Sequence, residues 1–158
     1  MSADPVHLDR IGTFRLPMAA PVAFELFTPE GERRWIPGWS PGYLHPTDGA
    51  VGEGLVFRTG HEGELVHWLV TRYLPCQLSI EYCRIAEGSR LGTVAVTCRP
   101  AGVSDTEVNV RYRMTATSGA GRSALAQFAS GFEQMMVGWR EAIVASIATD
   151  PARGGASR

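Results

Sequence analysis

The strongest constraint on the fold is a series of strand-like runs followed by one long amphipathic segment. The runs are LVFRT, ELVHWLVTRYL, QLSIEYCRI, LGTVAVTCR and TEVNVRYRMTA, and the turn signals GHEG, PC, AEGS and PAGVSD separate them. Consecutive strands joined by connections this short lie antiparallel to each other. Residues 55 to 116 therefore predict a sheet of consecutive hairpins.

The last run alternates most clearly between apolar and polar residues. Side chains along a strand point to opposite faces in turn, so this pattern gives one dry and one wet face. The residues predicted for the dry face are Val108, Val110, Tyr112 and Met114, and those for the wet face are Glu107, Asn109, Arg111 and Arg113.

The segment SALAQFASGFEQMMVGWREAIVASIA has apolar residues at spacings of three and four, as expected for an amphipathic helix of about seven turns. Ser118 or Ser123 would cap its first turn. We expect this helix to cover the dry face of the sheet. Its apolar residues are Leu125, Phe128, Phe132, Met135, Met136, Trp139, Ile143 and Ile147.

The N-terminal part predicts a strand within Leu8–Leu16 and then two short helices. Pro21 suits the first turn of the first helix. Thr28 reads as the N-cap of the second helix, which ends near Trp35, and Glu32 approximately completes a capping box. An extended arm then leads through GYLH into the turn-rich stretch PTDGAVGEG.

The order of elements predicts an α+β fold with a curved antiparallel sheet of about seven strands wrapped on the C-terminal helix. The 158 residues suit one domain. We expect this domain to span residues 1–149 and residues 150–158 to form a disordered tail. A helix about 10 Å wide does not fill the groove of a strongly curved sheet, which leaves room for a cavity or for large side chains.

Charge and hydropathy exclude several classes of partner. Fifteen basic against sixteen acidic residues leave a net charge of −1, without the basic block that nucleic acid or anionic membrane selects. We expect no membrane insertion, because no run reaches about 18 apolar residues, and a cytoplasmic location, because the N-terminus lacks the pattern of a signal peptide. Cys76, Cys83 and Cys98 match no zinc or redox spacing and predict buried, reduced thiols.

Four segments carry a resemblance to a known superfamily: PVAFELFTPEGERRWIPGWSPGY, HWLVTRYLPCQLSIEYCRI, VNVRYRMTATSGAG and FEQMMVGWREAI. Together they resemble the SRPBCC or START-like superfamily across Leu8–Ala148. This superfamily includes the birch pollen allergen, polyketide cyclases and homologues of the heat-shock ATPase activator. The resemblance implies a helix-grip fold with a ligand cavity between sheet and long helix, and it supplies no catalytic motif to transfer.

Aromatic residues are the main candidates for the cavity wall. Trp35, Trp39 and Tyr43 lie in the segment that connects the short helices to the sheet. In the resembled fold this segment forms one rim of the groove. The alternative is that the three rings form a hydrophobic plug that holds the short helices against the sheet. The candidate ligand-binding residues are Trp35, Trp39, Tyr43, Phe57, His67, Trp68, Tyr82, Arg84, Tyr112, Phe128, Met135 and Trp139.

Two orientations stay open at the level of sequence. Arg84 shares a face with Tyr82; if that face points inward, the guanidinium must pair with a Glu or await an anionic ligand group, and otherwise it reaches solvent. His67 and Trp68 alternate, so only one of them faces the groove.

The stretch HEGELVH invites a metal site, but its spacing is one residue longer than the helical H-E-x-x-H motif and Gly63 marks a turn. Exposed polar turn residues explain it better. We therefore expect neither a metal nor a cofactor.

Three functions remain. The first is binding of a hydrophobic or aromatic small molecule, for which the thioethers of Met135 and Met136 would give an adaptable wall. The second is a cyclase or dehydratase that uses the same cavity, in which a polar group such as His67, Tyr82, Arg84 or Tyr112 handles protons or an enolate. The third is a co-chaperone-like module with a filled interior and a protein partner. A homodimer is compatible with all three.

Overall fold

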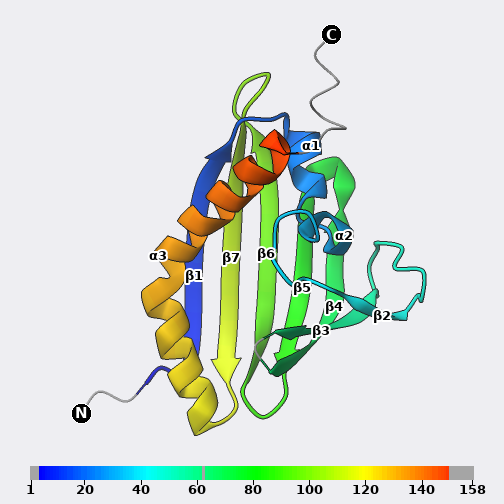
Figure 1. The fold of residues 1–158 in the computed structure, drawn as a ribbon. Helices are drawn as coiled ribbons and strands as arrows, with labels where there is room; N and C mark the ends of the chain where they lie inside the picture. Colours follow the sequence, from blue (N-terminus) through cyan, green and yellow to red (C-terminus); the bar gives the residue numbers. More distant parts are fainter. Residues whose placement is uncertain (1–3, 62, 150–158) are drawn as a thin grey trace.

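The computed structural model describes residues 4–61 and 63–149, and it confirms the helix-grip prediction (Figure 1). The predicted strand, two short helices, six further strands and long helix all occur in that order. The elements are β1 (His7–Leu16), α1 (Ala20–Glu25), α2 (Pro29–Glu32), β2 (Gly42–His45), β3 (Val56–His61), β4 (Glu64–Leu74), a 3-10 turn (Pro75–Gln77), β5 (Ser79–Ala86), β6 (Arg90–Pro100), β7 (Thr106–Ala116) and α3 (Gly119–Ala148).

All seven strands form one antiparallel sheet in the order β1-β7-β6-β5-β4-β3-β2. The consecutive hairpins from β3 to β7 follow from the short turns between them. The first strand pairs with the last one, with Ile11 opposite Arg111. This pairing leaves β1 and β2 as the two edges of the sheet.

The alternation in β7 sets the dry face as predicted. The side chains of Val108 and Val110 are fully buried, and Tyr112 and Met114 are 8% and 3% exposed. The intervening residues lie on the opposite face, where Arg111 pairs with Asp9 of β1 at 2.8 Å. The dry face is therefore the one that meets α3.

The long helix begins at Gly119, and Ser118, one of the two predicted capping residues, is its N-cap: the Ser118 hydroxyl oxygen accepts a hydrogen bond from the Gly121 amide at 3.0 Å. It buries Leu125, Phe132 and Ile143 against the sheet. Figure 1 shows α3 crossing the sheet diagonally, and its contacts fall mainly on β1 and β7. The dry face of β3, β4 and β5 is thus left for other parts of the chain to cover.

The two short helices form as expected, with one correction. Pro21 lies in the first turn of α1, and the Thr28 hydroxyl oxygen caps α2 by accepting from the Gly31 amide at 3.1 Å. However, α2 ends at Glu32, earlier than predicted, and the Glu32 side chain lines an internal cavity instead of closing a capping box. A capping box needs Glu or Gln at the third helical position, which is Gly31 here. Glu32 follows that position, so its carboxyl takes no part in the cap and turns inward.

The expectation of three buried thiols is wrong for Cys76. The structure gives three free cysteines, of which Cys98 is buried, Cys83 is half-buried and Cys76 is exposed. Cys76 lies on the 3-10 turn between β4 and β5, and connections run over the surface.

No helix in the described ranges is long and apolar enough to cross a membrane. The predicted tail, residues 150–158, lies outside the described residues.

Candidate functional site

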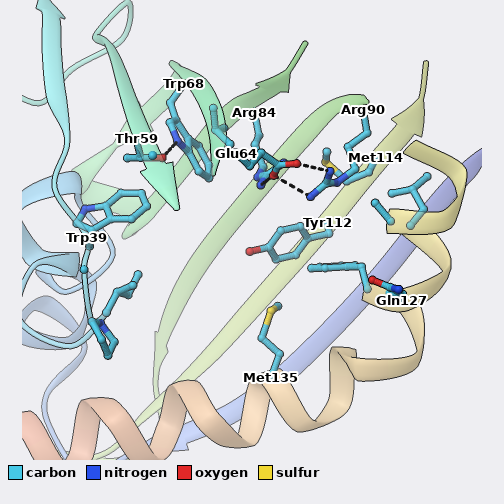
Figure 2. A pocket seen from close by; sticks show the side chains of 18 residues that line it. Trp39, Thr59, Glu64, Trp68, Arg84, Arg90, Tyr112, Met114, Gln127 and Met135 are labelled. Atoms are coloured by element: carbon cyan, nitrogen blue, oxygen red, sulfur yellow. Dashed lines mark hydrogen bonds and ion pairs between the residues drawn. The ribbon is translucent and has the colours of Figure 1, made fainter. Parts of the chain in front are cut away.

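The dry face of the sheet, α3 and the segment before β2 line a cavity of two adjoining chambers, and Figure 2 shows the side chains that line the outer one. The outer chamber has a volume of about 530 Å³ and is lined by Ile36, Pro37, Gly38, Trp39, Thr59, Gly60, Glu64, Val66, Trp68, Arg84, Arg90, Tyr112, Met114, Ala124, Leu125, Gln127, Phe128 and Met135. The inner chamber has about 80 Å³ and is lined by Glu32, Ile36, Trp39, Phe57, Trp68, Tyr82, Val94, Val96, Tyr112 and Trp139. Shared lining residues, among them Tyr112, show that the chambers adjoin.

Three aromatic rings form the wall near β3 and β4. Phe57 and Trp68 stack with ring planes 4° apart, and Trp39 meets Trp68 edge-on at 5.8 Å. Hydrogen bonds hold both indoles: Trp39 Nε1 donates to the Pro29 carbonyl at 2.9 Å, and Trp68 Nε1 donates to the Thr59 hydroxyl at 3.0 Å. With their polar ends satisfied by the protein, these rings present apolar faces and edges to the cavity.

The structure resolves which of two neighbours on β4 faces inward. Trp68 lines both chambers, and His67 lies on the opposite face of the sheet, across from Arg58 on β3 and Ile85 on β5. His67 is therefore not brought into the cavity. The reason is the two-residue period of the strand, which assigns neighbouring residues to opposite faces.

Trp35 and Tyr43 also lie outside both chambers. Trp35 is 5% exposed, donates its indole hydrogen to the Leu26 carbonyl at 2.8 Å, and packs against Phe27 and Trp139. This is the plug arrangement, in which the ring holds the short helices to the core. Tyr43 contacts Phe57 edge-on and donates its hydroxyl hydrogen to the Glu30 carboxylate.

The other nine candidate residues line the cavity. They share inward-facing positions on the segment before β2, on β3, β4, β5 and β7, and on α3. These nine are Trp39, Phe57, Trp68, Tyr82, Arg84, Tyr112, Phe128, Met135 and Trp139. In α3, Phe128 and Met135 contribute to the outer chamber and Trp139 closes the inner one, because spacings of four and seven residues return to one helix face.

Two tyrosines on the inner face differ in their hydrogen bonding. The Tyr82 hydroxyl donates to the Phe27 carbonyl at 2.6 Å and so ties β5 to the end of α1. Figure 2 shows the Tyr112 hydroxyl pointing into the outer chamber, and Tyr112 lines both chambers. Burial raises the pKa of both phenols, so both remain neutral donors at physiological pH.

Charged residues gather at one end of the outer chamber. Glu64 accepts a hydrogen bond from Arg84 Nη2 at 3.1 Å and two from Arg90, through Nη1 at 3.0 Å and Nη2 at 3.1 Å. Burial alone would raise the pKa of Glu64, but the hydrogen bonds and charges of Arg90 and Arg84 outweigh it and lower the pKa. Arg84 therefore meets a glutamate, which was one of its two expected inward-facing roles, and Glu64 is more than an exposed turn residue.

Glu32, like Glu64, is a functional candidate that sequence reasoning missed. It lines the inner chamber beside Tyr82 and Tyr112, and burial raises the pKa of its carboxyl well above the ordinary value. By accessible surface Glu32 is half-buried, and it is one of the residues that line the chamber of about 80 Å³. Glu32 belongs to the TPEGE motif, which predicts the start of a helix. An acidic residue in such a motif is expected to be exposed, so nothing in the sequence indicates that Glu32 points inward.

The described part of the chain contains no cluster of three or more histidines, cysteines or acids that could hold a metal ion. The arrangement instead offers an apolar slot with three kinds of polar group. These are a guanidinium pair at the outer end, a phenol at the junction and a protonatable carboxyl at the inner end.

Comparisons with known proteins agree on the fold. No family model and no curated protein matches the chain. Among solved structures it is similar to norcoclaurine synthase from Thalictrum flavum, with a TM-score of 0.67 at 10% identity over 95% of this chain and 99% of that one. It is also similar to the Zhui aromatase/cyclase from Streptomyces sp. R1128, with a TM-score of 0.61 at 12% identity over 89% of this chain and 90% of that one. A third similar structure is major latex-like protein 151 from Panax ginseng, with a TM-score of 0.65 at 12% identity over 89% of this chain and 97% of that one.

These similarities define the class of fold: the chain is a helix-grip protein. This is the fold that the four sequence segments implied. At 10% to 12% identity the likeness concerns the fold alone.

Proposed function

We propose that the protein binds an aromatic or other hydrophobic small molecule in the two chambers. The observation that carries this proposal is the outer chamber of about 530 Å³, whose wall includes Trp39, Trp68 and Phe128. Small-molecule sites typically have volumes of 300–1,000 Å³, mostly apolar walls and a few placed polar groups.

A structural neighbour supports an aromatic ligand. Norcoclaurine synthase has been solved in complex with dopamine and hydroxybenzaldehyde, and that structure covers 92% of this chain with a TM-score of 0.63. Both are single-ring aromatic molecules. The edges and faces of the Trp39 and Trp68 rings are suited to ring-on-ring contacts of the same kind.

The test is a titration of fatty acids, flavonoids and aromatic polyketides, followed by tryptophan emission and thermal melting. A ligand that binds the native state raises the melting temperature with its concentration. Ala124→Trp would fill the outer chamber and should weaken binding more than tenfold. Ala145→Trp, on an exposed position of the same helix, is the matched control and should bind normally. Equal binding by both variants would overturn the proposal.

A second candidate function, proton-transfer catalysis, is favoured by Glu32. Burial raises the pKa of the Glu32 carboxyl well above its ordinary value, which makes it a stronger proton acceptor than an exposed glutamate, and the Tyr112 phenol lines the same chamber as a hydrogen-bond donor. A proton acceptor and a hydrogen-bond donor lining one chamber are the two groups that enolisation of a bound ketone uses. The reaction would move one proton from the carbon next to the carbonyl to Glu32, while Tyr112 donates to the developing enolate oxygen.

Hydrogen exchange in D2O tests this candidate without knowledge of the natural substrate. Any ketone that binds is incubated with protein, and deuterium incorporation next to the carbonyl is followed by mass spectrometry. Catalysed exchange in the wild type and its loss in Glu32→Gln with binding intact would support catalysis. Exchange at the rate without protein would leave a binding protein only.

The partner-module alternative predicts a filled interior, so the outer chamber weighs against it. The proposal also keeps the earlier predictions of a cytoplasmic location without nucleic acid or membrane insertion. A homodimer remains compatible with it, because the chambers are lined by residues of one chain.

A further inference from the structure

The Arg84 guanidinium is incompletely satisfied inside the protein. Its side chain is 17% exposed, and Nη2 bonds to Glu64. The Nη1 nitrogen is buried and has no hydrogen-bond partner among the described residues. A buried donor on a charged group that lacks an acceptor is unfavourable, so a ligand that supplies an acceptor there gains affinity.

The neighbouring glutamate does not satisfy this donor because it is shared. Both Glu64 oxygens already accept hydrogen bonds from Arg90 Nη1 and Nη2, as well as the one from Arg84. Two arginines against one glutamate leave one net positive charge in the cluster. Arginine stays protonated, and the pKa of Glu64 is lowered, so this excess persists at neutral pH.

The cluster lies where a substituent of a bound ring would reach it. Arg84 lies over the Trp68 ring at 5.6 Å, and Trp68 is part of the aromatic wall. Figure 2 shows the Tyr112 ring below the arginine pair and Met135 of α3 beyond it. A ring held against Trp68 therefore directs a substituent on one side towards Arg84.

We propose that the outer chamber takes an aromatic or apolar monoanion, whose carboxylate accepts a hydrogen bond from Arg84 Nη1. This inference rests on the proposed function and adds the class of ligand. One carboxylate neutralises the single excess charge, whereas a phosphate dianion would leave excess negative charge beside Glu64. Arg84 lines the chamber, and because its Nη1 is buried, the proposed contact requires the guanidinium to turn towards the ligand.

The first test needs no variant and compares matched pairs of acids and their methyl esters by calorimetry at pH 7. The pairs are built on naphthalene (2-naphthoate), anthracene (9-anthracenecarboxylate) and an alkyl chain (dodecanoate). The ester keeps the apolar body and removes the charge. We expect the acid of the preferred pair to bind about tenfold or more tightly than its ester, as charge-assisted hydrogen bonds allow.

The second test replaces the guanidinium. Arg84→Met keeps the length of the side chain and leaves Glu64 paired with Arg90, so no carboxylate is orphaned. It should weaken binding of the acid about tenfold and leave the ester unchanged. The matched control is Arg111→Met, which removes an ion-paired arginine from the outer face of the sheet and should change neither affinity.

The outcomes separate this inference from the function on which it rests. If esters bind as tightly as acids, or if Arg84→Met weakens both equally, the anion subsite is overturned while ligand binding stands. If neither member of any pair binds, nor any compound of the larger panel, ligand binding itself is overturned. A preference for the acid that Arg84→Met abolishes and Arg111→Met retains establishes the subsite.

Discussion

Phe57 and Trp68 lie directly opposite each other on β3 and β4, with ring centroids 5.9 Å apart and planes 4° from parallel. Cross-strand neighbours of this kind stabilise a sheet while holding each other in place. Trp39 meets both rings edge-on, at 6.2 Å from Phe57 and 5.8 Å from Trp68. The aromatic wall is therefore built before any ligand arrives, which reduces the ordering cost of binding.

Replacing Trp68 should weaken binding of aromatic ligands. An aromatic pair contributes about 0.5–1.5 kcal/mol beyond area burial, so Trp68→Leu should lower the affinity by about two- to twelvefold. His67→Leu changes the adjacent residue, which lies on the outer face, and should bind normally. Calorimetric titration of both variants checks this, and an equal loss in both would contradict the inward orientation of Trp68.

The two inner tyrosines should differ in stability. Tyr82→Phe removes the 2.6 Å hydrogen bond to the Phe27 carbonyl and should lower the free energy of unfolding by about 1–3 kcal/mol. Tyr112→Phe removes a hydroxyl that points into the cavity and should change the free energy of unfolding by less than about 0.5 kcal/mol. Urea denaturation measures both values. Equal losses would show that the Tyr82 bond does not tie β5 to the short helices.

Glu32 should make stability depend on pH in a direction opposite to most acids. Because burial raises the folded-state pKa of Glu32, the folded protein keeps this proton after the unfolded chain has lost it. The stabilisation that Glu32 contributes is therefore complete at pH values below its ordinary pKa of 4.5, and it decreases as the pH rises above 4.5. Glu32→Gln should match the wild type near pH 4 and melt at a higher temperature at pH 8.

Glu30 provides the control of opposite sign on the same helix. Hydrogen bonds from Arg33 and Tyr43 lower the pKa of Glu30, so its contribution is present above 4.5 and lost as pH falls. Glu30→Gln should therefore melt at a lower temperature than the wild type at pH 8 and approach it at acid pH. If Glu32→Gln followed the same course as Glu30→Gln, the burial of Glu32 would be disproved.

The start of α3 should be intolerant of one methyl group. A Cβ atom on Gly121 would lie 1.8 Å from the Ser89 carbonyl oxygen, which is backbone and cannot move aside freely. Gly121→Ala should lower the free energy of unfolding by about 1–3 kcal/mol. A Cβ atom on Gly119 would have no other atom within 4 Å, so Gly119→Ala should raise the free energy of unfolding by about 0.4–1 kcal/mol. Thermal melting of the pair checks how closely α3 approaches the β5–β6 turn.

The fold was largely predictable because its signals are local. Alternation in β7 predicts its buried face, Ser118 and Thr28 predict helix starts, and short turns predict antiparallel neighbours. The pairing of β1 with β7 joins distant parts of the chain, and it was not among the predictions made from the sequence. Local patterns carry no information about such long-range pairing.

The site was predictable where a side chain follows the period of its element. Phe128, Met135 and Trp139 repeat along one face of α3, and all three line the cavity. Glu32 and Glu64 were missed because each lies at the end of an element, where the direction of a side chain depends on tertiary packing. An acidic residue in a turn motif is usually exposed, and nothing in the sequence distinguishes these two.

The central claim, that ligands occupy the chambers between sheet and α3, is tested most directly by nitrogen-15 NMR of the four tryptophan indoles during titration with a ligand. Trp39, Trp68 and Trp139 line the chambers, whereas Trp35 is held in the core by its bond to the Leu26 carbonyl. We predict large shifts of the first three indole signals and the smallest shift for Trp35. Saturable binding that leaves all four signals in place would contradict the claim.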